Sequence, residues 1–337
     1  MNATDNQTRE CNPLGVYGPG EPPVPASLLW AALVHCFCLI VIGTLGNALA
    51  LWCVVTCRQT RREVKVLLFS VFLPALLVCL VTRPVIAEVR IALLTCDLHR
   101  VSKRVLKANS VVYVFLAQTE VASIAAVAVT RAVSVWAPHK PKLGLRGTVV
   151  LLTVICVYAA LTGMVLLRME ATGALDEAWA DTLITTLYFL DATVPALVTT
   201  VAYALIVFVI QRNKRRLAAS QCQAREATMM DHATRAMLAV FISNLIFGIP
   251  HSIHHLMGKQ PHYMKVIFHV LFSTHFMVDP LAFVWFNSGY RRRVGAKIMR
   301  VTQAISPLPS SVHPESASNH DHHHQHSSKH KQEEVKI

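Results

Sequence analysis

The sequence predicts an all-α membrane protein, built as a seven-transmembrane helix bundle that is followed by a short amphipathic helix. Of its 337 residues, 53% are hydrophobic and only 15% are charged, which is typical of a membrane protein. Seven apolar stretches each reach the roughly 20 residues that a helix needs to cross a bilayer. These stretches lie near residues 28–55, 66–90, 108–136, 147–167, 183–210, 234–257 and 264–286.

Basic residues gather in every second connection between the apolar stretches. The formal net charge of +13 would suit a nucleic-acid-binding protein, but its distribution follows the positive-inside rule of membrane proteins. The rule places these segments in the cytosol and the amino terminus outside the cell, and we expect no nucleic-acid partner. The basic residues are Arg58, Arg61, Arg62 and Lys65, then Lys140, Lys142 and Arg146, then Arg212, Lys214, Arg215 and Arg216, and finally Arg291, Arg292, Arg293, Lys297 and Arg300.

Residues 1–27 are expected to form an extracellular, glycosylated tail ahead of the bundle, which spans residues 28–286. Asn2 and Asn6 each begin an Asn-x-Thr sequon, the acceptor for N-glycosylation. The tail lacks the basic region and short apolar core of a cleaved signal peptide, so the first span itself is expected to direct insertion. The plasma membrane is the expected destination.

Two of the nine cysteines, Cys11 and Cys96, lie outside the cell in this topology. The others lie in or beside the spans or face the cytosol, where thiols stay reduced. Because an oxidising exterior favours pairing, we expect a disulfide between Cys11 and Cys96 that ties the tail to the first external loop.

Prolines interrupt four of the predicted spans, and each one frees a backbone carbonyl that must be satisfied inside the bundle. Such positions suit a bundle that opens and closes, although prolines are also generally commoner in membrane helices than in soluble ones. They are Pro74, Pro84, Pro195, Pro250 and Pro280.

Short motifs occur in a fixed order along the spans. They are Gly46-Asn47 in the first span, Arg131 with Pro138 at the end of the third, Pro195 with Tyr203 in the fifth, Phe247-Gly248-Ile249-Pro250 in the sixth and Asp279-Pro280-Leu281-Ala282-Phe283 in the seventh. Their order and spacing resemble those of the rhodopsin-like (class A) G-protein-coupled receptors over residues 28–300. The resemblance implies a receptor that signals through its helix bundle.

Several positions depart from the pattern of that family, so the resemblance assigns no subfamily. The usual cysteine of the second external loop is also missing between residues 168 and 186. The departures are Ala75 in place of a sodium-binding aspartate, Thr130 in place of the acid before the arginine, Ala132 in place of the aromatic residue after it, Gly248 in place of a tryptophan and Phe283 in place of a tyrosine.

The resemblance assigns G-protein coupling to Arg131, with Tyr203 turning inward to support it. It also implies a heterotrimeric G protein as partner, with arrestin and receptor kinases acting on the carboxyl-terminal tail. An arginine at a helix end can instead be an interfacial anchor, and this alternative stays open. Because Thr130 removes the acidic restraint on Arg131, we expect raised basal signalling.

Four polar residues are expected to form a centre deep in the bundle. Glu120 precedes Arg131 by about three helical turns on nearly the same face, and a buried carboxylate is by default a functional residue. Three interpretations remain open: a neutral, hydrogen-bonded Glu120, a sodium site, or a proton-linked switch through His275. The four residues are Asn47, Glu120, His275 and Asp279.

Seven residues of the outer half are expected to line a ligand pocket, at the place where the family binds its ligands. Their cationic groups favour a carboxylate, a phosphate or a lipid head group. Two alternatives stay open: internal pairing of Arg83 with Glu88 and of Asp191 with His251, and sensing of extracellular pH by the histidines. The seven are Arg83, Asn109, Tyr113, Asp191, His251, His255 and His269.

Residues 287–300 show the fourfold apolar spacing of an amphipathic helix on the inner membrane surface. Residues 301–337 are rich in serine, proline and histidine and are expected to be disordered in the cytosol. The histidine run at 320–326 is expected to be solvated, with weak binding of zinc or nickel as the alternative.

Two functions therefore remain in competition. The first is a receptor that passes an extracellular signal, from an unknown ligand or from pH, to a G protein. The second is a non-signalling seven-helix protein such as a scavenger, decoy, chaperone or transporter. An enzyme is not expected, because the loops are too short for a catalytic domain and neither a nucleophile–base pair nor a metal-ligand spacing is evident. Beyond the sodium ion, no cofactor is expected.

Overall fold

The structure, a computed structural model, describes seven stretches of the chain. Outside them lie residues 1–23, with Asn2, Asn6 and Cys11, and residues 306–337, with most of the tail. The glycosylation sites and the tail therefore stay predictions. The described stretches are 24–58, 60–97, 100–137, 143–172, 177–217, 224–257 and 261–305.

All the secondary structure in the described stretches is helical, which confirms the predicted fold class. The elements are α2 (Ala26–Cys38), η1 (Leu39–Gly43), α3 (Thr44–Thr56), α4 (Arg62–Leu77), η2 (Val78–Thr82), α5 (Arg83–Thr95), α6 (Lys103–Trp136), α7 (Leu145–Thr172), α8 (Glu177–Tyr188), η3 (Phe189–Thr193), α9 (Val194–Leu217), α10 (Ala224–Leu256), α11 (His262–Ser273), α12 (His275–Phe286) and α13 (Ser288–Ile305). The η elements are π-helical turns within longer helices.

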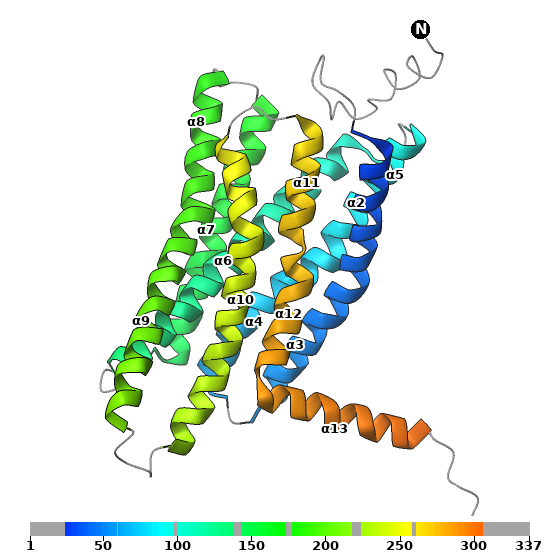
Figure 1. The fold of residues 1–337 in the computed structure, drawn as a ribbon. Helices are drawn as coiled ribbons and strands as arrows, with labels where there is room; N and C mark the ends of the chain where they lie inside the picture. Colours follow the sequence, from blue (N-terminus) through cyan, green and yellow to red (C-terminus); the bar gives the residue numbers. More distant parts are fainter. Residues whose placement is uncertain are drawn as a thin grey trace, which may run out of the picture. The chain divides into compact units, whose positions relative to one another are not determined.

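These elements join into seven helices that are long and apolar enough to cross a membrane, so the chain is a multi-pass membrane protein. Consecutive spans run in opposite directions (Figure 1). The end of the bundle with Cys96 and the start of α6 is called the Cys96 end below, and the opposite end, with Arg131, is called the Arg131 end.

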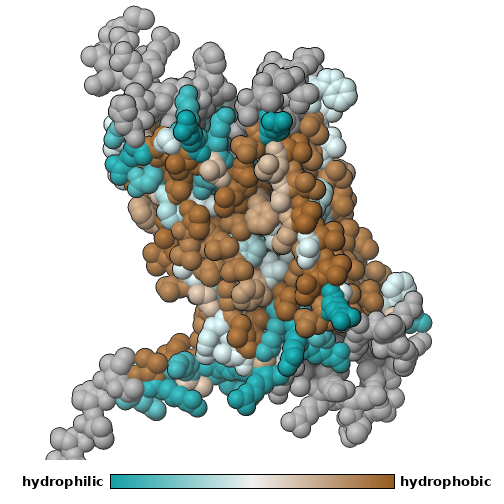
Figure 2. All heavy atoms as spheres, turned by 180° about the vertical axis from the view of Figure 1, so that it is seen from behind, coloured by the Kyte–Doolittle hydropathy of each residue, from teal (hydrophilic) through white to brown (hydrophobic). Residues whose placement is uncertain are grey.

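Large apolar side chains are exposed along the spans, for example Leu45, Leu161 and Ile246. Figure 2 shows them as a broad hydrophobic band with hydrophilic residues at both ends, as lipid contact requires.

Three of the spans contain a π-helical turn of five residues. Such a turn widens the helix locally, and it often accompanies a kink or a functional site. One turn, η2, lies between Pro74 and Pro84, and another, η3, ends two residues before Pro195. Pro250 and Pro280 instead lie inside the continuous helices α10 and α12.

The Gly46-Asn47 motif satisfies a carbonyl that Pro280 leaves free. Proline has no N–H, so the carbonyl of Phe276, four residues earlier in α12, loses its helical partner. The Nδ2 group of Asn47 donates to this carbonyl at 2.8 Å and to the carbonyl of Gly43, also at 2.8 Å. A Cβ atom at Gly46 would lie only 3.1 Å from Cγ of Pro280, so glycine permits the close approach of α3 and α12 that this bond needs.

Phe283, which stands where the resembling family has a tyrosine, packs in the core at the Arg131 end. Its ring centroid lies 4.6 Å from that of Phe72 and 5.3 Å from that of Tyr290, at the start of α13. The Oδ1 atom of Asn287 accepts from the backbone N–H groups of Gly289 and Tyr290 and so caps α13. This helix continues to Ile305, five residues past the boundary expected at 300.

Cys96 ends α5 in the left-handed conformation, with φ of 54°. It is disulfide-bonded, as the sequence analysis expects. Its predicted partner, Cys11, lies outside the described residues, so the pairing itself remains a prediction.

Replacement of Asn47 by alanine is expected to destabilise the bundle by about 1–3 kcal/mol, because it leaves the buried carbonyl of Phe276 without a partner. Thermal unfolding of the purified protein in lipid discs measures the change. Thr56→Ala is the matched control, since the exposed Thr56 hydroxyl donates only to Trp52 of its own helix. Equal unfolding temperatures for the two variants would contradict the role given to Asn47.

Candidate functional site

A cavity of about 600 Å³ lies between α5, α6, α8, η3, α9, α10 and α11. It has the size and the mostly apolar lining of a small-molecule site. All seven residues expected to form a ligand pocket line this one cavity. The structure also adds residues that the sequence analysis missed, among them Arg90, Gln118, Tyr188, Asn244 and Lys265.

Arg83 is a buried cation held against aromatic rings. Its side chain is 5% exposed, and Cζ lies 5.3 Å from the ring centroid of Tyr113 and 5.6 Å from that of Phe276. Within the described part of the chain, its Nε atom has no hydrogen-bond partner. Because guanidinium is always charged, this wall of the cavity is electropositive.

The expected pairing of Arg83 with Glu88 is wrong. Glu88 instead bonds to Nε of Arg100 at 2.6 Å, and this bond raises the pKa of the Arg100 guanidinium. Residues five apart on a helix point about 140° away from each other. Glu88 therefore projects to the exposed surface while Arg83 faces the cavity.

The expected pairing of Asp191 with His251 is also wrong. The two oxygens of Asp191 accept from Nε2 of Gln118 and from the hydroxyl of Tyr158, the latter at 2.6 Å. His251 contacts the hydroxyl of Tyr188 through Nδ1, at 2.8 Å. Neutral donors thus satisfy the carboxylate of Asp191. Because these donors lie on two other helices, no spacing in the sequence could have identified them.

The cavity reaches deep into the bundle because Gly248 lacks a side chain. A Cβ atom added at Gly248 would meet no atom within 4 Å, at the position where the resembling family has a tryptophan. Below this opening, Phe241 and Asn244 of α10 line the cavity. The floor of the cavity therefore includes residues that also belong to the core.

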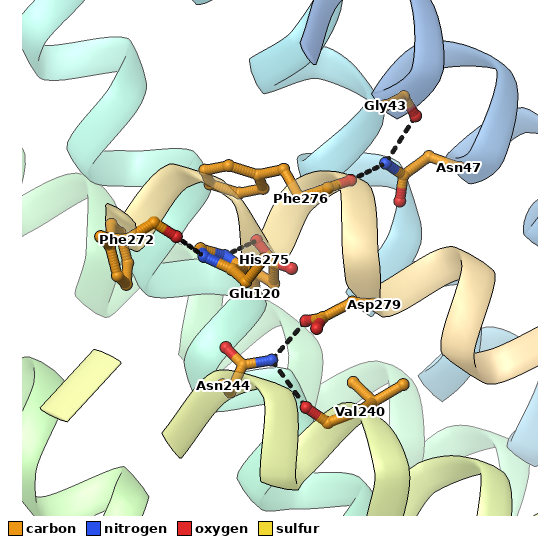
Figure 3. A network of polar contacts seen from close by, with 9 residues as sticks. All are labelled: Gly43, Asn47, Glu120, Val240, Asn244, Phe272, His275, Phe276 and Asp279. Carbon is orange, nitrogen blue, oxygen red and sulfur yellow. Dashed lines mark hydrogen bonds and ion pairs between the residues drawn. The ribbon is translucent and has the colours of Figure 1, made fainter. Parts of the chain in front are cut away.

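Glu120, His275 and Asp279 meet in the buried centre of the bundle (Figure 3). Each is at most 2% exposed, and their candidate ligand atoms all lie within 4.8 Å of one another. Nε2 of His275 is 3.7 Å from Oε2 of Glu120. The break between α11 and α12 at Thr274 places His275 at the start of the new helix, facing α6.

Two asparagines surround this centre in different ways. Asn244, which the sequence analysis missed, donates from Nδ2 to Oδ2 of Asp279 and to the carbonyl of Val240. Asn47 was expected to belong to the polar centre with the two acids, but its side-chain amide donates to backbone carbonyls instead. The centre is thus built from α6, α10 and α12, and Asn47 supports it through the backbone of α12.

The hydrogen bonds suggest how a proton is held here. Nδ1 of His275 faces the carbonyl of Phe272, which only accepts, so Nδ1 carries a hydrogen. Nε2 faces Oε2 of Glu120 at 3.7 Å, which is too long for a hydrogen bond. This oxygen has no hydrogen-bond partner in the described stretches, so a closer approach of the two groups would let one proton lie between them. Sodium prefers oxygen ligands, whereas imidazole nitrogen is one of the three groups present. The neutral Glu120, the sodium site and the proton-linked switch all stay predictions, and we expect a centre that holds no sodium.

Arg131 lies at the other end of α6 without an ion-pair partner in the described stretches. The hydroxyl of Thr130 donates to the carbonyls of Ala126 and Val127 in its own helix, so it does not hold the arginine. Arg131 lies in the neighbourhood of Tyr203 and Tyr290. Tyr203 is buried and stacks on Phe241, with ring centroids 5.2 Å apart.

Glu120→Gln and His275→Gln are expected to be non-additive in stability, with a coupling of about 0.5–3 kcal/mol, because the two buried side chains face each other at 3.7 Å. The free energies of unfolding of wild type, both single variants and the double variant measure this coupling.

The same four proteins are compared in sodium chloride and in choline chloride at equal ionic strength. Equal stability in the two salts is expected. Stabilisation of the wild type by sodium that Glu120→Gln abolishes would instead establish an ion site, since a ligand stabilises the state that binds it.

Comparison with known proteins supports the fold through structure alone. No family model and no curated protein matches the sequence. The crystal structure of squid rhodopsin is similar, with a TM-score of 0.70, 10% sequence identity, and coverage of 86% of this chain and 94% of that chain. The chain therefore has the seven-helix fold of the rhodopsin-like G-protein-coupled receptors.

Proposed function

We propose that this protein is a plasma-membrane receptor that passes a signal from its cavity to a heterotrimeric G protein at Arg131. In this proposal the Cys96 end faces outside, in line with the positive-inside rule, and the cavity opens toward the extracellular ligand. Arrestin and receptor kinases would act at the Arg131 end and on the tail.

One observation carries the proposal: a short chain of contacts joins the cavity to Arg131. Phe241 lines the cavity floor and stacks on Tyr203. Tyr203 in turn lies in the neighbourhood of Arg131. The hydroxyl of Tyr203 is buried without a hydrogen-bond partner in the described stretches, so a second arrangement in which it gains one would remove the cost of leaving it unpaired. A ligand that displaces Phe241 would shift the bundle toward that arrangement.

Among the described residues Arg131 has no acidic partner, which supports raised basal activity. An exposed ion pair contributes about 0–1 kcal/mol, and its loss weakens the inactive state by a similar amount. The active fraction of a two-state receptor then rises by up to a few-fold without ligand.

The charges of the cavity favour an anionic ligand with an apolar body. Arg83, Arg90 and Lys265 line it, against the single carboxylate of Asp191, which has its own donors. Arg90 is already engaged by the carbonyl of Ala32 and the Sγ atom of Cys36, so Arg83 is the main anchor. A carboxylate or phosphate would accept the hydrogen bond that the Nε–H group of Arg83 does not make in the described stretches.

Ligand-free activation of a panel of G proteins in cells tests the proposal. Wild type is expected to show basal activity, Arg131→Ala to lose it, and Thr130→Asp to lower it several-fold, at matched surface expression. Arg146→Ala, which removes an exposed arginine at the same end, is the control and is expected to keep it. Basal activity that persists in Arg131→Ala would contradict coupling through this residue.

Arg83→Gln is expected to lower the potency of anionic amphiphiles by roughly 10- to 100-fold, which corresponds to the 1.5–3 kcal/mol of a hydrogen bond to a charged group. Long-chain carboxylates and lysophosphatidate serve as probes in the same assay. Arg104→Gln, an exposed change at the Cys96 end, is expected to leave potency unchanged. Responses confined to neutral or cationic compounds would overturn the ligand class.

A further inference from the structure

Three histidines in the wall of the cavity converge on a common point. His251 and His255 are one helical turn apart on α10, and His269 lies on α11, which packs beside α10 (Figure 1). One ring nitrogen from each lies within 4.8 Å of the others. We propose that His251, His255 and His269 bind a zinc ion, which goes beyond the proposed signalling function and does not depend on it.

The distances suit a tetrahedral zinc site. Nε2 of His251 lies 3.2 Å from Nδ1 of His269 and 3.3 Å from Nε2 of His255. Two nitrogens that each lie 2.0–2.1 Å from zinc at the tetrahedral angle are about 3.3 Å apart. The nitrogens of His255 and His269 lie within 4.8 Å of each other and would approach to about 3.3 Å when both bind one ion.

The rings are held in place by neighbours that do not compete for the ion. Tyr188 contacts Nδ1 of His251 through its hydroxyl at 2.8 Å, which leaves Nε2 to face the cluster. His251 stacks on Phe272 with centroids 4.3 Å apart, and His255 stacks on Tyr188 at 4.5 Å. A partner that fixes ring orientation and tautomer in this way is typical of histidine ligands of metals.

The hydrogen-bonding capacity of the three imidazole rings also favours a bound ion. Each neutral imidazole has one N–H donor and one lone pair. In His251, Nδ1 is occupied by the hydroxyl of Tyr188. Its Nε2 atom faces one nitrogen of His255 and one of His269, and it can form a hydrogen bond with only one of them. A zinc ion accepts a lone pair from all three rings at once, because each neutral ring can direct one lone pair to it.

The fourth coordination position would face the cavity, which all three histidines line. Three permanent cations lie near the cluster: Lys265 acts electrostatically on His255, and Arg83 and Arg90 act on His269. These charges oppose a bare dication, so they favour an anionic fourth ligand such as a carboxylate or hydroxide. The sequence signal that was overlooked is the four-residue spacing of His251 and His255, which puts two ligands on one helical face.

Zinc binding by the full-length protein in lipid discs tests the site. The tail histidines are replaced by serine in every form, and purification avoids a histidine tag, so neither competes for zinc. Titration calorimetry is expected to show one equivalent of zinc per chain, and the unfolding temperature is expected to rise with zinc concentration. The replaced tail residues are His313, His320, His322, His323, His324, His326 and His330.

His255→Gln and His269→Gln are each expected to weaken zinc binding by at least about tenfold. His35→Gln is the matched control, since His35 bonds to Thr274 outside the cluster, and it is expected to bind zinc as the parent does. The unfolding temperature without zinc shows which variants are folded, and either folded variant decides the question. A parent that binds no zinc, or a folded variant with undiminished affinity, would overturn the proposal.

Discussion

The bundle depends on one constraint of the membrane interior, that every backbone polar group must find a partner within the protein. Pro280 leaves the carbonyl of Phe276 free, and Asn47 satisfies it from α3. That bond requires close helix contact, which Gly46 permits. It fixes the register of α12 against α3, and the register places His275 and Asp279 opposite Glu120. The carbonyl left free by Pro280 thus helps to set the position of Glu120, His275 and Asp279. In the described stretches these three form the only buried cluster that combines carboxylates with a histidine.

From this centre the structure extends toward both ends of the bundle. Asn244 bonds to Asp279 and also lines the cavity, so a ligand on the cavity floor touches a residue of the polar centre. Phe241, one turn earlier on α10, connects the same floor to Tyr203 and Arg131. A single helix, α10, therefore contacts the cavity, the centre and the surroundings of Arg131. Its Pro250 lies inside the helix near the cavity, where a bend would move the segment below it.

The sequence predicted the features that follow from hydrophobicity and helical period. The spans could be predicted from runs of apolar residues. The cavity could be predicted because the helical period places Arg83, Asn109 and Tyr113 on faces that point into the bundle. The failures lie where partners come from distant helices. Glu88 was paired with Arg83 although its spacing turns it away, and the bonds of Asp191 to Gln118 and Tyr158 depend on how three helices pack. The role of Asn47 became clear only when the carbonyl freed by Pro280 was seen beside it.

The proposed signalling function requires that the Arg131 end of this bundle opens to admit a G protein. Pulsed electron spin resonance between labels at Trp136 on α6 and Arg235 on α10, with the protein in lipid discs, measures the opening directly. The account predicts a second, longer distance that gains population when nucleotide-free G protein is added and that Arg131→Ala suppresses. One unchanged distance with every G protein tested would contradict it.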